Sequence, residues 1–463
     1  MFNTAMVKTL KVSLFPIHSK IDHTHIVSAG EYIVLDHLLR KLVFVNKHGD
    51  IVSDLAQSWD VDHSKNEVKF TILKNQKFSN GETITTDKIV ASFLEQQKKK
   101  SATHFDFTSV SAIKKLNEES IVISLTTKVN IDFFTSLSQP EFGIAYNVEK
   151  LNDYSITSGA YFLKSTNKAQ FTLERNIHYP SNGKVNQLII NRSGLDKNTF
   201  NNLKSGELDF YIPYAGVEPC VLDIIEKDTK LTLTKPNIGF TYWLSLNPML
   251  IGDADRYLLN KVITSCMDTK DISTGGWSRA RQLVFENSFG QMSTAEVSEL
   301  FKKEAMSKAS MKEVTFLSFK DFAFNDLIVD CLNSTGAKVK ISFYQDQKEL
   351  SELIKKNDYQ IVLNNNDFAS INVLKNFKVA FNQARPLFFL GEFKEKCNEL
   401  VELGYLEIEK NKREQKIVEL QKVVIGNSLA IPLTYKRVNY IHNSEMSLKQ
   451  WPMNFPYINF DRI

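Results

Sequence analysis

Three histidines in HSKIDHTHI, residues 18–26, come closest to a metal-binding spacing, because His23 and His25 form a His-x-His pair near His18. Such a pair could chelate a divalent cation. No second cluster of histidine, cysteine or carboxylate side chains follows, and an isolated pair on a strand-like segment is usually incidental. The sequence therefore predicts no metal and no other cofactor.

The cysteines and the catalytic motifs exclude further chemistry. Cys220, Cys266, Cys331 and Cys397 lie far apart and form no Cys-x-x-Cys or metal-ligand spacing, so their disulfide state stays open. The chain contains no GxSxG, HExxH, GxxxxGK or GxGxxG motif. Acidic and basic residues abound without the spacing that catalysis requires, and we predict that the protein is not an enzyme.

The charge pattern excludes another class of partner. The net charge of +4 is small and dispersed over 463 residues, and the longest basic run, Lys98–Lys100, is interpreted as a solvated helix end. We therefore predict no nucleic-acid partner. No apolar stretch approaches the length of a membrane span.

The elements that must position any functional residue are mixed strands and helices. Residues 68–72 alternate apolar and polar as a half-buried strand does, Asn80-Gly81 favours a turn, and Thr85-Thr86-Asp87 precede a helical stripe. Strands are also predicted in SIVISLTT, in both halves of AYFLKSTNKAQFTLERN, and in VKISFY and QIVLNN, each of the last two preceded by a helix. FNNLKSGELDFYI predicts a helix stopped by Gly206 before a strand, and Arg413–Val424 predict an amphipathic helix halted at Gly426.

The length and the first residues bound the organisation and the location. A chain of 463 residues exceeds the size of a single core, so two or three lobes are expected. Residues 1–17 contain no continuous apolar segment and no small-residue cleavage site, and Leu10, Val12 and Leu14 alternate as in a first strand. Either an export signal has been removed or the protein stays inside the cell.

The order of several short segments carries a resemblance to a known family. Asp54-Leu55-Ala56 and Ser58-Trp59 lead into the strand, turn and capped helix of residues 68–93. Then follow SGAYFL (158–163), LERNIHY (173–179), LKSGELDF (203–210), LLNKVITSCMDTKDI (258–272) and SLAIPLTY (428–435). This ordered set resembles family 5 of the extracytoplasmic solute-binding proteins, the peptide-, dipeptide- and nickel-binding receptors of ABC importers. The similarity covers nearly the whole chain.

The resemblance implies an α/β fold of the periplasmic-binding-protein type (type II, cluster C), with three lobes around a ligand cleft and a discontinuous first lobe. We expect lobe I in residues 1–40, 156–238 and 438–463, an inserted lobe II in residues 41–155, and lobe III in residues 239–437. Hinges are expected near Pro236–Gly239 and Tyr435–Tyr440, where closure on a ligand would rotate lobe III. The implied protein is a monomeric periplasmic or extracytoplasmic receptor that delivers a peptide or peptide-like solute to an ABC permease.

The resemblance also suggests ligand-binding residues. Asp367 stands where peptide-binding members carry the aspartate that meets the peptide amino terminus, although it could instead cap the helix predicted in SINVLKNF. Trp277, in a glycine-rich loop, could line the pocket or lie exposed, and Trp243 could border the cleft or belong to the core. The remaining candidates are Asn365 and Asn366 beside Asp367, and His104, Phe105 and Phe107 at the expected lid strand, where the two phenylalanines could also be core.

Other functions stay open beside the peptide receptor. NNNDFASI, residues 364–371, lacks the tryptophan and proline of the corresponding family segment, and its asparagines could bind sugar hydroxyls, so an oligosaccharide ligand is an alternative. A nickel chelate is another. A cytoplasmic ligand sensor of the same fold is a third alternative, which would need an additional DNA-binding domain.

Overall fold

The computed structural model divides the chain into two units, which are described separately. Unit 1 comprises Met1–Pro236 and Val438–Ile463, and unit 2 comprises Asn237–Arg437. The structure describes residues 9–14, 17, 20–26, 28–46, 50–98, 109–181, 183–192, 199–212, 225, 227–234, 239–272, 276–302, 311–345, 347–355, 359–368, 373–382, 388–444 and 460. Among the helices of these residues, none has both the length and the apolar character needed to cross a bilayer.

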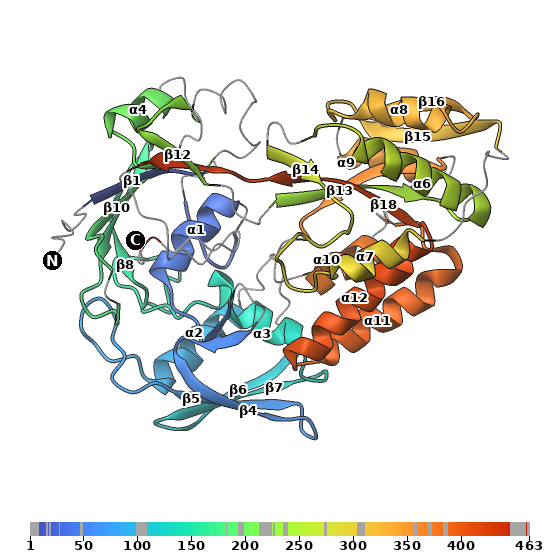
Figure 1. The fold of residues 1–463 in the computed structure, drawn as a ribbon. Helices are drawn as coiled ribbons and strands as arrows, with labels where there is room; N and C mark the ends of the chain where they lie inside the picture. Colours follow the sequence, from blue (N-terminus) through green and yellow to red (C-terminus); the bar gives the residue numbers. More distant parts are fainter. Residues whose placement is uncertain are drawn as a thin grey trace. The chain divides into compact units, whose positions relative to one another are not determined.

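The first sheet of unit 1 has seven strands in the order β12-β19-β11-β1-β10-β9-β8 (Figure 1). β1 runs parallel to β10 and β11, and its alternating Leu10 and Val12 are buried, as the sequence pattern predicted. The strands are β1 (Thr9–Ser13), β8 (Tyr161–Thr166), β9 (Gln170–Arg175), β10 (Gln187–Asn191), β11 (Phe210–Tyr211), β12 (Leu231–Thr234) and β19 (Tyr440–Asn443). All seven come from the three segments expected to form lobe I.

A second group of strands in unit 1 lies within residues 41–155. β4 (Ala56–Asp62), β5 (Glu67–Ile72), β7 (Ser120–Leu125) and β6 (Val110–Asn117) form an antiparallel sheet in the order β4-β5-β7-β6, and β2 (Val43–Val45) pairs with β3 (Ile51–Ser53). Because each of these strands falls within the segment expected for lobe II, we propose the division of unit 1 into lobes I and II.

The strand, turn and helix predicted in residues 68–93 are confirmed. Val68 and Phe70 of β5 are buried, and Gly81 takes a positive φ of 85° within a turn closed by a bridge between Lys77 and Thr83. α2 (Thr86–Lys98) follows, and its Lys88 N–H donates to Thr85 Oγ1 at 3.3 Å. The other helices described in unit 1 are α1 (Ala29–Leu38), α3 (Ile131–Leu137), η2 (Pro140–Phe142) and α4 (Thr199–Ser205), the last ending before Gly206 as predicted.

Unit 2 is built on a six-stranded mixed sheet in the order β14-β18-β13-β17-β15-β16. Its strands are β13 (Gly239–Leu246), β14 (Trp277–Arg279), β15 (Glu313–Phe319), β16 (Lys338–Tyr344), β17 (Ile361–Asn366) and β18 (Ala430–Arg437). β15 runs parallel to β16 and β17, in agreement with the predicted alternation of helices and strands, whereas β13, β14 and β18 are antiparallel to their neighbours.

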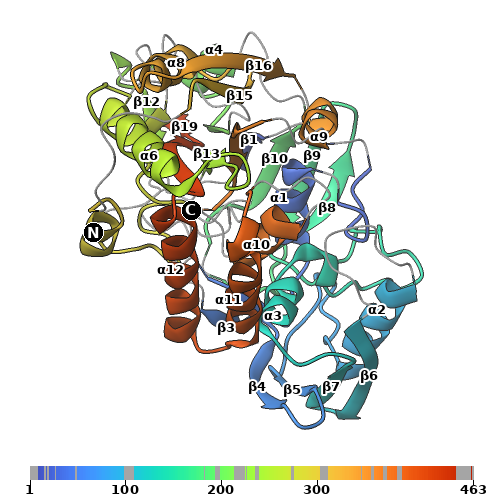
Figure 2. The same cartoon turned by 90° about the vertical axis from the view of Figure 1, so that its right-hand side faces the viewer.

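Helices lie on both faces of the unit 2 sheet. They are α6 (Asp253–Asp268), α7 (Thr294–Leu300), α8 (Asn325–Asn333), α9 (Gln347–Lys355), α10 (Val373–Asn382), η4 (Gly391–Phe393), α11 (Lys394–Leu406) and α12 (Lys410–Gly426). α6 and α8 pack on one face, hereafter the α6/α8 face, through Leu259, Ile263 and Ile328. α11 and α12 lie side by side, and α12 ends at Gly426 as predicted (Figures 1 and 2).

A disulfide joins the two helices of the α6/α8 face. It links Cys266 of α6 to Cys331 of α8, across 65 residues of sequence. Cys397 in α11 is a buried free thiol, and burial raises the pKa of this thiol to about 12. A thiol with so high a pKa is protonated at neutral pH and therefore unreactive.

Candidate ligand-binding edge

One edge of the unit 2 sheet collects most of the candidate residues that the structure describes. β13 begins there at Gly239, β14 begins at Trp277, and β17 and β18 end there at Asn366 and Arg437. Unit 2 itself begins at Asn237 and ends at Arg437, so the chain enters and leaves the unit beside this edge. We call it the crossing edge.

The strand register places four residues in one row along the crossing edge. Trp277 of β14 lies opposite Lys436 of β18, which lies opposite Phe240 of β13. On the next strand Asn366 lies opposite Thr241, so Asp367 follows at the level of Phe240. Directly opposite residues of antiparallel strands share a face of the sheet.

Asp367 belongs to the same face as the rest of this row. Phe368 packs on Trp243, with ring centroids 5.5 Å apart, on the face opposite to α6 and α8. Because side chains alternate along an extended chain, Asp367 is directed to the α6/α8 face, to which Tyr242 of β13 also belongs. The sheet thus carries an aromatic ring, a cation, a second aromatic ring and a carboxylate in order, hereafter the Trp277–Asp367 row.

Aromatic packing fixes the Trp277 end of the row. The Trp277 ring meets Tyr242 edge-to-face at 5.1 Å between centroids, and Phe322 and Phe324 at 5.7 and 5.4 Å. Tyr242 also stacks on Phe322 at 5.2 Å. Trp277 was predicted to lie in a loop, and this prediction was wrong, because its backbone pairs with Lys436 as the first residue of β14.

Lys436 lies against this aromatic cluster. Its Nζ lies 4.6 Å from the centroid of the Trp277 ring, a distance at which a cation is attracted to the ring face. Partial burial lowers the pKa of the Lys436 ammonium from its ordinary value. Phe240, the next residue of the row, exposes 37% of its surface although it is large and apolar.

The backbone around Asp367 is held from two sides. Its N–H donates to Asn366 Oδ1 at 2.8 Å, and its carbonyl accepts a hydrogen bond from Asn376 Nδ2 of α10. Asn365, Asn366 and Asp367 are all partly exposed. Asn364 differs, because it is buried and donates through Nδ2 to Ser245 Oγ at 3.1 Å. The alternative role of Asp367 as a helix cap concerns residues 369–372, which lie outside the described part of the chain.

Trp243 is a core residue. It is fully buried, its ring stacks on Phe388 at 4.9 Å, and its Nε1 donates to Ser245 Oγ at 2.9 Å. Trp243 is therefore excluded as a candidate ligand contact, because its only polar group is satisfied inside unit 2 and no part of its ring is exposed. His104, Phe105 and Phe107 lie outside the described residues, and their roles stay predictions.

His23 of the histidine pair is held by contacts with side chains of unit 1. His23 is fully buried, its backbone N–H donates to Tyr154 Oη at 2.9 Å, and its ring Nδ1 and Nε2 lie 3.1 Å from Tyr154 Oη and 3.3 Å from Gln96 Nε2. His18 lies outside the described residues. Within the described part of the chain, no group of three or more histidine, cysteine or carboxylate side chains is arranged to hold a metal ion.

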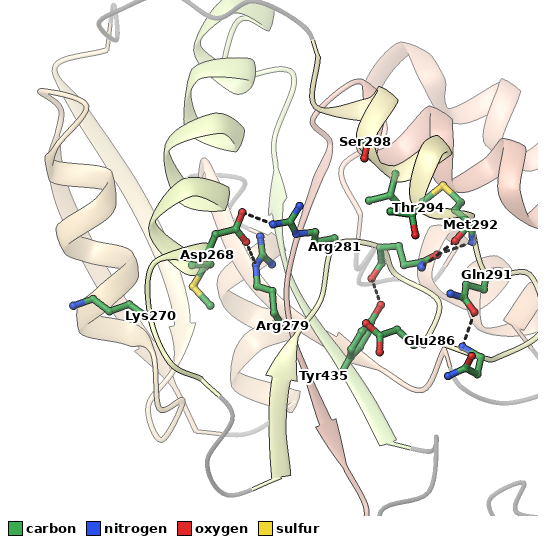
Figure 3. Close-up of a pocket in the computed structure, with 14 residues that line it drawn as sticks. Asp268, Lys270, Arg279, Arg281, Glu286, Gln291, Met292, Thr294, Ser298 and Tyr435 are labelled. Atoms are coloured by element: carbon green, nitrogen blue, oxygen red, sulfur yellow. Dashed lines mark hydrogen bonds and ion pairs between the residues drawn. The ribbon is translucent and has the colours of Figure 1, made fainter.

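A polar pocket of about 650 Å³ lies beside β14 (Figure 3). It is formed by the end of α6, by β14 and the segment after it, by α7, and by Tyr435. Asp268 at the end of α6 accepts hydrogen bonds from Arg279 Nε and Arg281 Nη2, each at 2.8 Å. Arg279 Nη1 also donates to the carbonyls of Pro432 and Leu433 in β18, at 2.7 and 2.8 Å.

These contacts fix β14, and with it Trp277. The Arg279 guanidinium ties β14 to α6 through Asp268 and to β18 through two carbonyls. Burial lowers the pKa of the Arg279 guanidinium, while Asp268 acts in the opposite direction and favours the charged form. The Asp268 carboxylate therefore compensates the partial desolvation of a cation two residues from Trp277.

Replacement of Asp268 by asparagine is expected to destabilise the protein by about 2 kcal/mol, because charge-assisted hydrogen bonds to Arg279 and Arg281 are lost. Denaturant unfolding followed by fluorescence measures the change. Glu299→Gln is the matched control, since Glu299 pairs with Lys302 at the surface, with both side chains more than two-thirds exposed, and such pairs contribute less than about 1 kcal/mol. Equal stability of the two variants would contradict the assigned role of Asp268.

Sequence reasoning missed Lys436, Phe240 and Tyr242. The signal available for Lys436 was a cation that follows the apolar strand IPLTY inside a predicted hinge. Its partner on the neighbouring strand, however, is more than 150 residues away, and only the register reveals it.

The fold is that of the periplasmic-binding-protein class, in which α/β lobes are joined by strands that cross between them. NikA and MppA are two of the solved structures that share it. NikA from Brucella suis, in complex with Fe(III)-EDTA, matches with a TM-score of 0.75 at 14% identity, over 98% of this chain and 99% of that one. MppA, a periplasmic murein tripeptide binding protein in its unliganded open form, matches with a TM-score of 0.77 at 16% identity, over 98% and 96%.

Sequence comparison finds similarity to one family within this class. Residues 50–262 match the model of the bacterial extracellular solute-binding proteins, family 5. The probable D,D-dipeptide-binding periplasmic protein DdpA of Escherichia coli (strain K12) is 23% identical over 435 residues, which cover 86% of this chain and 81% of that protein. This match agrees with the family that the order of the segments predicted, and the names of DdpA and MppA describe both as binding proteins.

Proposed function

We propose that this protein captures a peptide with a free amino terminus and delivers it to an ABC permease. The observation that carries the proposal is the placement of Asp367 on the crossing edge, directed to the α6/α8 face at the level of an exposed Phe240. A partly exposed carboxylate accepts charge-assisted hydrogen bonds from an ammonium group. The names of two similar proteins, a D,D-dipeptide-binding and a murein tripeptide binding protein, support a peptide ligand.

The polar neighbours of Asp367 favour one alternative. Asn365 and Asn366 are partly exposed and could donate and accept hydrogen bonds with sugar hydroxyls. A carboxylate, however, forms stronger charge-assisted hydrogen bonds with an ammonium than with a neutral hydroxyl. We therefore favour the peptide.

The proposed place of action is the periplasm or another extracytoplasmic compartment. The disulfide between Cys266 and Cys331 supports this location, because disulfides persist in oxidising compartments and are rare in the cytoplasm. We further propose a monomeric receptor.

Ligand capture is proposed to involve hinges at the two chain crossings, residues 236–239 and 435–440. Gly239 lies at the first crossing, where it has a φ of 152° and a β-carbon would lie 1.9 Å from the Lys436 carbonyl oxygen. Only glycine permits such close packing of β13 and β18 at this point. Pro236, Asn237 and Ile238 lie outside the described residues.

Calorimetry with three ligand classes tests the proposed function. The purified protein is titrated with trialanine, with a linear trisaccharide and with Ni(II)-histidine under the same conditions. We expect heat of binding with trialanine alone. Saturable binding of the trisaccharide or the nickel chelate, with none of the peptide, would replace the proposed function by the corresponding alternative.

A further inference from the structure

The polar pocket beside β14 has the size of a small-molecule site. Its volume of about 650 Å³ lies within the range of roughly 300–1,000 Å³ that is usual for such sites. Because β14 is the last strand at one side of the unit 2 sheet, the pocket lies at that side, between the end of α6 and α7 (Figure 3). None of the four residues of the Trp277–Asp367 row lines it, so it is a second candidate site within unit 2.

Positive charge exceeds negative charge in this pocket. Arg279 Nε and Arg281 Nη2 donate to the two oxygens of the same Asp268 carboxylate, so two guanidinium groups share one negative charge. The other carboxylate of the lining, Glu286, is paired outside the pocket, because its Oε2 lies 3.7 Å from Arg437 Nη2. An anion bound in the pocket would therefore balance an excess of positive charge.

The two guanidinium groups also retain donors for such an anion. Arg279 Nη2 is buried and has no hydrogen-bond partner among the described residues. Arg281 is half-exposed, and within the described part of the chain its guanidinium donates to Asp268 alone, through Nη2. A buried donor of a cation without an acceptor is unfavourable, and an anion supplies the strongest acceptor.

Two hydroxyl groups of α7 complete the set of donors. Thr294 and Ser298 both line the pocket and are four residues apart, so they share one face of this helix. In the view of Figure 3, Arg281 lies between Asp268 and these two side chains. A guanidinium and two hydroxyls suit a phosphate group, which offers three acceptor oxygens, better than a carboxylate, which offers two.

We propose that this pocket binds the phosphate group of a small molecule, held by the Arg281 guanidinium and by the hydroxyls of Thr294 and Ser298. The inference goes beyond the proposed function and does not depend on it. The free phosphate ion and a phosphate ester share this chemistry. The volume of the pocket favours the ester, because it leaves room for an organic group beside the phosphate.

The test is calorimetry on the full chain with four probes: glucose 6-phosphate, glucose, gluconate and inorganic phosphate. We expect saturable binding of glucose 6-phosphate, none of glucose, and binding of gluconate that is about tenfold weaker. Arg281→Gln should weaken the binding of glucose 6-phosphate about tenfold or more, because a charge-assisted hydrogen bond is lost. Ser298→Ala should weaken it about fivefold, and this variant leaves the hydrogen bonds between Asp268 and the two arginines in place.

Lys340→Gln is the matched control, since it removes one positive charge from an exposed residue of β16, the strand at the opposite side of the same sheet. This variant should bind glucose 6-phosphate as the native protein does. Tighter binding of inorganic phosphate than of the ester would support the site and identify the free ion as its ligand.

Three results would overturn the inference. The first is the absence of saturable binding with both phosphate probes, and the second is tighter binding of gluconate than of glucose 6-phosphate. The third is binding that Arg281→Gln and Ser298→Ala both leave unchanged, because the phosphate would then lie elsewhere on the protein. The titration with trialanine tests the proposed function separately, so that its failure is distinguished from failure at this pocket.

Discussion

Replacement of Asp367 by asparagine is expected to weaken the binding of a free-amine tripeptide by about 2–3 kcal/mol, or roughly 30-fold to 150-fold. The substitution keeps the shape of the side chain and removes the charge that pairs with the ammonium. The backbone hydrogen bonds of Asp367, from its N–H to Asn366 and to its carbonyl from Asn376, do not involve the carboxylate. We therefore expect these two backbone hydrogen bonds to persist in the variant while the affinity falls.

The measurement is calorimetry with trialanine and N-acetyl-trialanine on both proteins. Acetylation should cost the native protein about as much affinity as the substitution does, and should cost the Asp367→Asn variant little, because the two changes remove the same ion pair. Asp330→Asn serves as control, since Asp330 lies exposed on α8. If native protein bound the acetylated and free peptides equally, the amine would not be anchored by Asp367.

Removal of the disulfide has the largest expected effect on stability. The bond between Cys266 and Cys331 closes a loop of 65 residues, for which the loss of loop-closure entropy in the unfolded chain corresponds to about 4 kcal/mol. The double variant Cys266→Ala, Cys331→Ala is therefore expected to unfold at a clearly lower denaturant concentration than the native protein. Unfolding curves of both proteins, with and without dithiothreitol, provide the comparison.

The reductant distinguishes the disulfide from simple loss of side-chain volume. Dithiothreitol should destabilise the native protein and leave the double variant unchanged, because the variant lacks the bond between Cys266 and Cys331 that the reductant breaks. A native protein whose unfolding curve did not respond to reductant after incubation in denaturant would show that the bond contributes nothing to stability.

Sequence patterns predicted the features that depend on neighbouring residues. The buried alternation of Val68 and Phe70, the turn at Gly81 and the end of α12 at Gly426 follow from side-chain periodicity and from the freedom of glycine at positive φ. The order of such segments was also sufficient to identify the family. Each signal lies within a few residues of the structure that it specifies.

Features that join distant segments could not be predicted from local sequence patterns. The sequence left the disulfide state of four cysteines open, and the packing of α6 on α8 selected Cys266 and Cys331. Trp277 looked like a loop residue because three residues are too few for a recognisable strand pattern, and only pairing with β18 defines β14.

The sequence by itself determined the family, the local elements and the carboxylate of Asp367 as a candidate anchor. Only the tertiary structure placed Lys436 beside Trp277 and in one row with Phe240 and Asp367, and enclosed Trp243 in the core. The physical reason is that these placements depend on the register between neighbouring strands. A shift of one residue between two strands reverses the face to which every side chain points, and no local pattern in β14 or β18 encodes the residue that lies opposite.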